Sequence, residues 1–202
     1  MLMKLIFATN NNHKLKEIQH LLKNNISLLS LSDIGFNEEL FETGNSLEEN
    51  AIQKAQYIYK KYKIDCFADD TGLEIDALEG KPGILSARYA GEKKSAEDNI
   101  KKVLFEMNKK KNRNCKFITV ISLIIGNKTY LFEGKIKGSI LYTPRGNNGF
   151  GYDSIFQPKG FTKSFAEMSL EEKNTISHRA IVIKKLAEFL NRNTDFYSVP
   201  NL

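Results

Sequence analysis

Two adjacent carboxylates, Asp69 and Asp70, lie between an apolar run and a glycine in the segment FADDTGLEID. Successive side chains of a strand point to opposite faces, so one acid can meet a ligand while the other orients a neighbour. We expect the strand to end at this pair. A solvated turn is the commoner explanation for an isolated Asp-Asp-Thr-Gly, but the remaining motifs favour an acid/base and metal site.

Glu42, in the segment FETG, is a third acid that precedes a glycine. Surface solvation is the usual explanation for such a residue. Together with Asp69 and Asp70 it offers hard oxygen donors, which suit Mg²⁺ bridged to substrate phosphates. The sequence offers no histidine and cysteine set for a softer metal, because Cys66 and Cys115 stand in strand-like apolar segments, where we expect reduced core residues.

A polar loop follows the first apolar run and carries Thr9, Asn11 and Lys14. Free backbone N–H groups and the helix dipole at such a place favour a phosphate, and Lys14 adds a positive charge. The segment is not a P-loop, because GxxxxGK[ST] is absent, and a plain polar helix start explains the spacing equally well.

The segment from Gly146 to Asp153 carries three glycines among aromatic and amide side chains. Such a loop lets the backbone approach a ligand closely while Phe150 or Tyr152 stacks on a flat ring. It lacks the order of the dinucleotide-binding fingerprint, and a glycine-rich hairpin loop is the plainer alternative.

A second basic cluster, Lys173, His178 and Arg179, stands where a short helical turn meets the last helix. These donors suit phosphates or the acceptor edge of a base. A charged helix start is the alternative, although solvation does not explain His178 beside the apolar Ile176 and Ala180.

Strands and helices alternate around these residues. Residues 4–9 read as a buried strand, followed by a helix with one apolar face at Leu15, Ile18, Leu21 and Leu22. Residues 115–125 and 129–132 predict a long β-hairpin around Gly126-Asn127. Helix starts are indicated by capping boxes at Ser46/Glu49 and Ser169/Glu172, by Ser95 as an N-cap, and by the apolar spacing of Ile176, Ala180, Ile183, Ala187 and Leu190.

Composition limits the class of protein. The 202 residues contain 41% hydrophobic and 27% charged residues, which is ordinary for a globular chain. The first apolar run is too short for a signal sequence or a membrane span, so we expect a cytoplasmic protein without membrane contact. No repeat or linker divides the chain, and we expect an α/β fold with a substantial mixed sheet in one domain, 1–202.

The formal charge of +6 suits an anionic partner, either a phosphorylated small molecule or a nucleic acid. The densest basic run, Lys109 to Arg113, lacks interleaved aromatic residues, and we expect a solvated loop rather than a nucleic-acid site.

Taken together, these segments resemble the inosine/xanthosine triphosphate pyrophosphatase family, whose members hydrolyse non-canonical purine nucleoside triphosphates. The resemblance runs from Ile6 to about Leu190 in six ordered motifs. Their sequences are ATNNNHK from Ala8, ETG from Glu42 with ENA from Glu49 and Lys54, ADDTGL from Ala68, PGI from Pro82 with SARY from Ser86, GFGYD from Gly149, and SHR from Ser177.

The resemblance implies a two-lobed α/β domain with an elongated mixed sheet flanked by helices, an active site in the central cleft, and a homodimer. It implies that Asp70 is the catalytic base and a Mg²⁺ ligand, that Glu42 lies at the metal, and that Asp69 is a supporting acid. It also implies substrate-binding residues, with the triphosphate near Thr9, Asn10, Asn11, Asn12, His13, Lys14, Lys54 and Thr71, and the base and ribose near Phe150, Gly151, Tyr152, Asp153, Lys173, His178 and Arg179.

The chain departs from the family pattern at Asn10, where glycine is common, and at Thr71, where serine is common but the hydroxyl is kept. The expected reaction splits ITP, dITP or XTP into the monophosphate and pyrophosphate. Two alternatives stay open: a basic nucleic-acid-binding protein that has lost hydrolysis, and a related pyrophosphatase for modified pyrimidine triphosphates.

Overall fold

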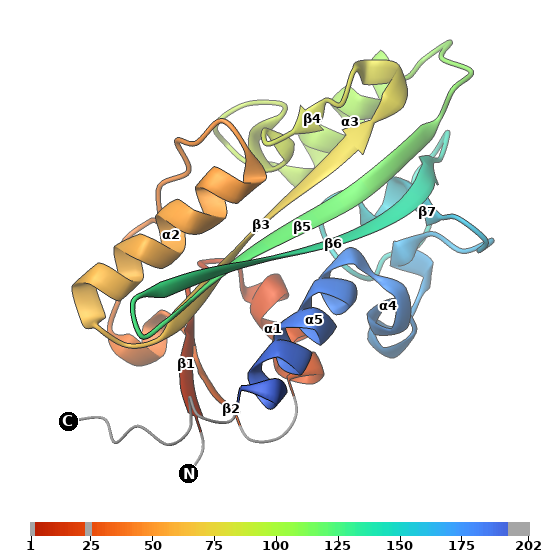
Figure 1. The fold of residues 1–202 in the computed structure, drawn as a ribbon. Helices are drawn as coiled ribbons and strands as arrows, with labels where there is room; N and C mark the ends of the chain where they lie inside the picture. Colours follow the sequence, from red (N-terminus) through yellow and green to blue (C-terminus); the bar gives the residue numbers. More distant parts are fainter. Residues whose placement is uncertain (1–2, 23–25, 194–202) are drawn as a thin grey trace. The chain divides into compact units, whose positions relative to one another are not determined.

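The computed structural model describes residues 3–22 and 26–193. The helices and strands of these residues confirm the predicted α/β class (Figure 1). The helices are α1 (Asn12–Leu21), α2 (Leu47–Tyr62), α3 (Ala96–Glu106), α4 (Leu170–Ile176) and α5 (His178–Arg192). The strands are β1 (Met3–Phe7), β2 (Ile26–Leu29), β3 (Cys66–Ile75), β4 (Pro82–Gly83), β5 (Asn114–Ile125), β6 (Lys128–Ile140) and β7 (Phe156–Pro158).

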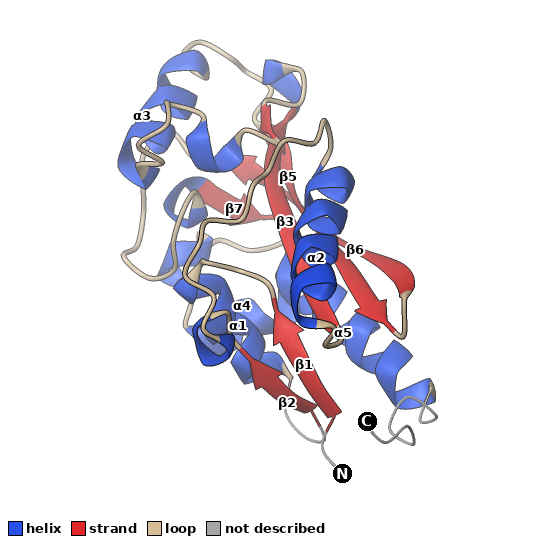
Figure 2. Cartoon of the chain, turned by 90° about the vertical axis from the view of Figure 1, so that its left-hand side faces the viewer, coloured by secondary structure: helices blue, strands red, loops and turns tan. Residues whose placement is uncertain are grey.

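The strands form a mixed sheet, as predicted. Its order is β2-β1-β3-β5-β6-β7, and β4 pairs with β3. Strand β1 runs parallel to both β2 and β3, whereas the β3–β4 and β6–β7 pairs are antiparallel. The short strand β2 was not predicted, because its four residues give little periodicity; it lies beside β1 with Leu5 opposite Leu28 (Figure 2).

The chain divides into two compact units. Unit 1 consists of Met1–Asp70, Val120–Gly134 and Arg179–Leu202, and unit 2 consists of Thr71–Thr119 and Lys135–His178. Strands β3, β5 and β6 each contribute residues to both units. The chain therefore passes between the units along its long strands, and each unit has an apolar core of its own.

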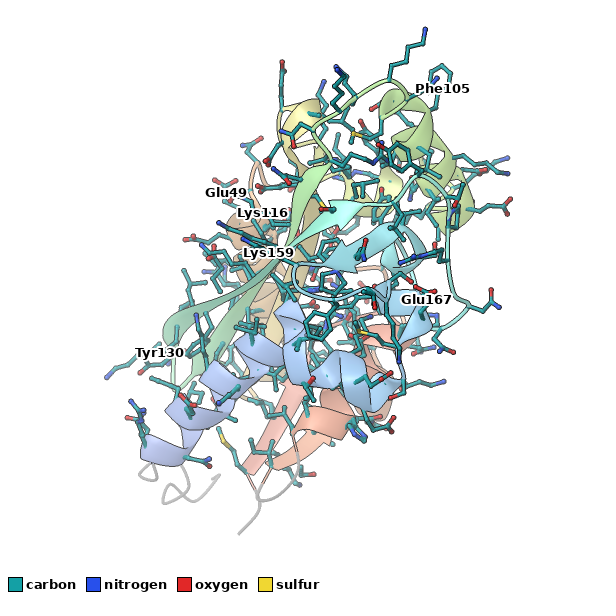
Figure 3. All side chains as sticks on the ribbon, turned by 90° about the vertical axis from the view of Figure 1, so that its right-hand side faces the viewer. Glu49, Phe105, Lys116, Tyr130, Lys159 and Glu167 are labelled. Carbon is teal, nitrogen blue, oxygen red and sulfur yellow. The ribbon has the colours of Figure 1, made fainter. Side chains whose placement is uncertain are left out.

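In unit 1 helices cover both faces of the strands. Helices α1 and α5 lie on one side of β1, and α2 lies on the other (Figure 1). Phe7 and Phe67 stack with ring centroids 4.6 Å apart in the core shared with α1 and α5. Tyr130 of β6 lies near the end of α5 (Figure 3), where its ring packs on Phe189 at 4.6 Å. The apolar faces predicted for the first and last helices thus pack against this core, although Leu15, Leu21 and Ala187 are only partly buried.

In unit 2 the core is built around aromatic rings. Phe117 of β5 packs on Phe156 at 4.6 Å, and Phe156 packs on Phe165 at 4.9 Å. Cys115 is buried in the same core and is a free thiol, as predicted, and so is Cys66 in unit 1. Phe105 of α3 is instead 80% exposed and points outward (Figure 3).

Three local predictions need correction. At α2 the Ser46 hydroxyl accepts from Glu49 N–H, but the Glu49 carboxylate accepts from Asn45 N–H, so the predicted capping box is only half formed. The hairpin is longer than predicted, since β6 continues to Ile140. Ile176 belongs to α4 and not to the last helix, because Ser177 is extended (ψ 155°) and separates the two helices.

The second predicted capping box is confirmed. The Ser169 hydroxyl accepts from Glu172 N–H, and the Glu172 carboxylate accepts from Ser169 N–H. A similar box at Ser164 and Glu167 was not predicted, because the 3₁₀-helix that it opens is only three residues long. Within the described ranges, no helix has the length and apolar character that a membrane crossing needs.

Candidate functional site

The two carboxylates at Asp69 and Asp70 lie in the middle of β3, so the prediction that the strand ends there was wrong. The strand continues to Ile75, where Leu73 pairs with Gly83 of β4. The Thr71 and Thr119 hydroxyls, 2.8 Å apart, also hold this part of β3 to β5. The predicted alternation is confirmed, since the two acids meet different partners on different helices.

Asp69 is surrounded by cations from α1 and α5. Its carboxylate oxygens lie 3.0 and 2.9 Å from Lys14 Nζ, and Oδ2 lies 3.7 Å from Arg179 Nη2. Burial alone would raise the pKa of Asp69, but Lys14 and Arg179 outweigh it and hold that pKa below its ordinary value. Asp69 is therefore a charged, fully engaged acid.

Asp70 faces α2, where Asn50 and Lys54 lie one turn apart on the buried face. Asn50 Nδ2 donates to Asp70 Oδ2 at 2.9 Å, and Lys54 Nζ lies 3.9 Å from Asp70 Oδ1. Burial raises the pKa of Asp70 above its ordinary value, and the charge of Glu42 adds to the rise despite the opposing Lys54 and Lys14. Asp70 is thus the more basic of the two neighbouring carboxylates.

Lys54 connects Asp70 to the third predicted acid. Its Nζ lies 2.5 Å from Glu42 Oε1, so one ammonium lies near two carboxylates. Burial alone would lower the pKa of Lys54, but Asp70 and Glu42 outweigh it and raise that pKa. For Glu42, the attraction of Lys54 outweighs burial and lowers the pKa. The structure thus places Glu42, Lys54 and Asp70 in one cluster.

Asn50 is a site residue that was not predicted from the sequence. Besides donating to Asp70, its Oδ1 accepts from Gly44 N–H at 2.8 Å, so one buried amide fixes both the carboxylate and the loop of Glu42. A Cβ on Gly44 would lie 2.6 Å from the Cβ of Glu49, so the loop needs glycine to approach α2. The signal in the sequence that could have identified Asn50 is its position four residues before Lys54, which places both side chains on the same face of the helix.

The expectation of free backbone N–H groups in the polar loop before α1 was wrong, because side chains already accept from them. Asn11 is the N-cap of α1, and its Oδ1 accepts from the N–H groups of His13 and Lys14. Asn11 N–H itself donates to Thr9 Oγ1 at 3.2 Å. These side chains cap the helix, so phosphate binding by those three N–H groups requires a rearrangement, whereas the Lys14 ammonium already lies at Asp69.

The remaining loop residues have separate contacts. The Asn10 amide donates to Glu38 O at 3.1 Å and accepts from Leu40 N–H at 3.3 Å, which holds the loop to residues 38–40. Asn12 and His13 are exposed at the start of α1. Asn10, the departure from the family pattern, therefore has a structural role of its own here.

In unit 2, Asp153 organises the glycine-rich loop. Its Oδ2 accepts from Phe150 N–H at 2.9 Å and from Lys173 Nζ at 2.6 Å. The same ammonium lies 5.1 Å from the centroid of the Phe150 ring and 5.4 Å from that of Phe165. Lys173 and the Phe150 ring are thus held together beside a buried carboxylate.

Tyr152 and Gly151 differ in their surroundings. The Tyr152 ring is buried in the core of unit 2, and its hydroxyl donates to Ser86 O at 2.9 Å. Of the two aromatic residues predicted as candidates for stacking on a flat ring, Phe150 is therefore the less buried. Gly151 has φ +60°, and a Cβ at that position would meet open space.

The basic cluster at the start of the last helix is divided between the units. His178 stacks on Phe117 at 4.6 Å and lies near Phe165, inside the core of unit 2. Arg179, the next residue, belongs to unit 1, where its guanidinium contacts Asp69 and forms an ion pair with Glu17. Glu17 was not predicted, because an acid within an amphipathic helix is usually solvated.

The basic run from Lys109 to Arg113 is an exposed loop, as predicted, apart from Arg113. The Arg113 guanidinium donates to the carbonyls of Met107, Ile140 and Leu141 and stacks on Tyr142 at 4.1 Å. Most of the hydrogen-bonding capacity of Arg113 is thus used to connect α3 to the end of β6.

Comparison with known proteins identifies the family. Residues 5–189 match the Ham1 family. The chain belongs to the Ham1 family. A protein of Flavobacterium psychrophilum named dITP/XTP pyrophosphatase is 54% identical over 187 residues, which cover 93% of this chain and 98% of the relative. A protein of Bacillus subtilis with the same name is 46% identical over 189 residues, covering 92% of this chain and 96% of the relative.

Solved structures of Ham1 proteins share the fold. The Staphylococcus aureus Ham1 protein superposes with a TM-score of 0.85 at 38% identity, covering 94% of this chain and 98% of that one. A nucleoside-triphosphatase / dITP/XTP pyrophosphatase from Mycobacterium abscessus gives a TM-score of 0.74 at 39% identity, covering 93% of this chain and 99% of that one. The family resemblance that was based on the six sequence motifs is therefore confirmed.

Proposed function

We propose that this Ham1 family chain is a dITP/XTP pyrophosphatase, a hydrolase of nucleotide metabolism. It would convert ITP, dITP and XTP to the monophosphate and pyrophosphate and so remove them from the nucleotide pool. The observation that carries the proposal is the cluster of the buried Asp70, Asn50 and Lys54 with the partly buried Glu42, found in a chain about half identical to proteins of that name.

The donor set around Asp70 fits Mg²⁺. Lys54 already lies near both the Glu42 and the Asp70 carboxylates, which indicates a place of negative potential. Among the described residues no three His, Cys, Asp or Glu side chains form a ready metal cluster. Mg²⁺ commonly uses only one or two carboxylates and completes its shell with water and substrate phosphates. We therefore propose Glu42 and Asp70 as its protein ligands.

The reaction that we propose is the attack of water on the α-phosphorus, with cleavage of the bond to the bridging oxygen and departure of pyrophosphate. Bound Mg²⁺ would neutralise phosphate charge and lower the pKa of the attacking water. Asp70 would accept the proton of that water, a role that its raised pKa favours over Asp69. Asn50 holds the Asp70 carboxylate in one orientation through Oδ2.

Positive charge for the triphosphate would come from Lys14 and Lys54. Both ammonium groups are nearly buried and are held by carboxylates, so they are preorganised to stabilise the negative charge on the leaving pyrophosphate. Thr9, Asn10, Asn11, Asn12, His13 and Thr71 are proposed to line the triphosphate side.

The base is proposed to stack on the Phe150 ring. Lys173 beside that ring offers only hydrogen-bond donors, which suit the oxygen of a 6-oxo purine. A 6-amino purine would instead point its own N–H hydrogens at those donors. A site built for such an acceptor can reject the wrong group by about 10⁴ or more. Gly151, Tyr152, Asp153, His178 and Arg179 are proposed to support the base and ribose, directly or through their neighbours.

We also propose a cytoplasmic homodimer in which the whole chain acts as one catalytic domain. Light scattering coupled to size-exclusion chromatography gives the mass of the assembly. A mass near twice 23.0 kDa is the expected result, and a mass near 23.0 kDa contradicts the dimer.

The test of the function is pyrophosphate release from ITP, dITP, XTP, GTP and ATP, each with Mg²⁺ and with excess chelator. We expect metal-dependent release from the first three only; the 6-oxo argument excludes ATP, whereas the exclusion of GTP, which shares the 6-oxo group, follows from the names of the relatives and not from Lys173. The Asp70→Asn variant should abolish turnover with little loss of folding, because the amide keeps the shape of the carboxylate. Wild-type turnover by that variant would refute the role of Asp70, and no release from any triphosphate would refute the enzyme.

A further inference from the structure

Three buried charges of unit 1 and the partly buried Lys14 form an alternating chain from α1 through β3 to α5 and back to α1. Lys14 pairs with Asp69, Asp69 Oδ2 lies 3.7 Å from Arg179 Nη2, and Arg179 Nη1 donates to Glu17 Oε2. Glu17 is 4% exposed and Arg179 is 1% exposed. A buried ionic group is costly unless it is paired, and this set of two acids and two bases is neutral.

Glu17 and Lys14 are three residues apart on α1, so their side chains lie on the same face of the helix. Glu17 pairs from this face with Arg179 of α5, which lies beside α1 (Figure 1). Glu17 is 162 residues from Arg179 in the chain, so the pair joins two helices that only the fold brings together.

Arg179 has acidic contacts on two sides, Glu17 through Nη1 and Asp69 through Nη2. Neutralising Glu17 would leave the guanidinium with a stronger attraction to Asp69. Asp69 is also the partner of Lys14, so two cations would then compete for one carboxylate. The Lys14 ammonium is thus linked to Glu17 through Asp69 and Arg179.

We propose that Glu17 is a positioning residue of the reaction: it holds Arg179 so that Asp69 stays paired with Lys14, and it thereby keeps the Lys14 ammonium in place for phosphate. This inference rests on the proposed function for its kinetic consequence but not for its binding consequence. A pair that merely fastened α5 to α1 would affect unfolding and leave phosphate affinity unchanged in the folded protein.

The kinetic test compares Glu17→Gln, which keeps the shape and removes the charge, with Glu17→Asp, which keeps the charge. We expect Glu17→Gln to lower kcat/KM for ITP at least tenfold, mainly through a higher KM, and Glu17→Asp to lie closer to the wild type. Glu48→Gln, an exposed acid at the start of α2, is the matched control and should stay within twofold. Circular dichroism and thermal unfolding establish that each variant is folded at the assay temperature.

A double-mutant cycle identifies the route of the effect. If Glu17 acts through Arg179, Glu17→Gln should change kcat/KM by less than twofold in an Arg179→Met background. An equal loss with and without Arg179 would overturn the proposal, and so would a folded Glu17→Gln variant with kcat/KM within twofold of the wild type.

Calorimetric binding of inorganic tripolyphosphate separates this proposal from the proposed function. We expect Glu17→Gln to weaken tripolyphosphate binding about tenfold while Glu48→Gln does not. A wild-type protein that binds tripolyphosphate but releases no pyrophosphate from ITP would refute the proposed enzymatic activity. The role of Glu17 would then be decided by the tripolyphosphate affinities alone. Equal affinity in wild type and Glu17→Gln, or no binding by the wild type, would overturn the positioning role.

Discussion

Replacing Gly149 by alanine tests whether Asp153 is the structural centre of the glycine-rich loop. Gly149 has φ +75°, and a Cβ there would overlap Asp153 Oδ2. That oxygen accepts from both Phe150 N–H and Lys173 Nζ, so the carboxylate cannot move without stretching two hydrogen bonds. Gly149→Ala therefore combines backbone strain with the displacement of a buried ion pair.

The expected magnitude follows from these two effects. A left-handed alanine costs roughly 1–2 kcal/mol, and the loss of a hydrogen bond to a charged group costs roughly 1.5–3 kcal/mol. We expect Gly149→Ala to lower the free energy of unfolding by about 2.5–5 kcal/mol. Gly160→Ala is the matched control, because Gly160 has φ +88° with open space around its Cβ. It should lose only about 1–2 kcal/mol.

Urea unfolding followed by circular dichroism measures both variants under the same conditions. We also expect Gly149→Ala to raise KM for ITP, because Phe150 and Lys173 lose their common anchor, whereas Gly160→Ala should not. Equal losses of unfolding free energy in the two variants would refute the reasoning, since they would show that Asp153 moves aside at no cost.

Three further substitutions test neighbouring parts of the site. Asn50→Leu should lower kcat for ITP and reduce the free energy of unfolding by about 2–3 kcal/mol, because the Asp70 carboxylate loses a buried donor; steady-state kinetics and urea unfolding check both. Asp69→Asn should destabilise the protein at pH 7. Because the pKa of Asp69 is lowered in the folded state, its carboxylate contributes its full stabilisation above the unfolded-state pKa of about 3.9, and this stabilisation disappears as the pH falls through the folded-state pKa. Unfolding measured from pH 7 to pH 3 should show the free energies of unfolding of the wild type and the variant converging. Tyr152→Phe should cost about 1 kcal/mol of stability by losing the bond to Ser86 and leave kcat/KM unchanged, so a large kinetic defect would show that the hydroxyl meets substrate.

Local signals predicted the elements well. Ser169 and Glu172 form the predicted capping box because both partners are three residues apart, and Gly126-Asn127 turns the hairpin because both residues have positive φ. The strand through Asp69 was placed correctly but ended too early. The glycine after Thr71 suggested a turn, whereas pairing with β4 keeps that part of the chain extended.

Long-range pairing limited the prediction of the site. The partner of Glu17 is Arg179, and no pattern within one helix indicates that an acid of α1 meets a guanidinium of α5. Asn50 is a similar example, because its two bonds reach Gly44 in one direction and Asp70 in the other. Sequence reasoning identified the residue types needed for chemistry but could not identify the residues that orient them.

Adjacent residues of one strand can perform different chemistry because a strand presents them to different helices. At Asp69 the attraction of Lys14 and Arg179 outweighs burial and lowers the pKa, whereas at Asp70 burial and the charge of Glu42 outweigh Lys54, Lys14 and the Asn50 amide and raise the pKa. Two titratable groups whose pKa values are pushed apart can take separate roles. Asp69 is suited to fixing Lys14, and Asp70 to accepting a proton. We therefore expect that no substitution at positions 69 and 70 alone exchanges the two roles. Each role is set by the helices that the side chain faces, which are α1 and α5 for Asp69 and α2 for Asp70.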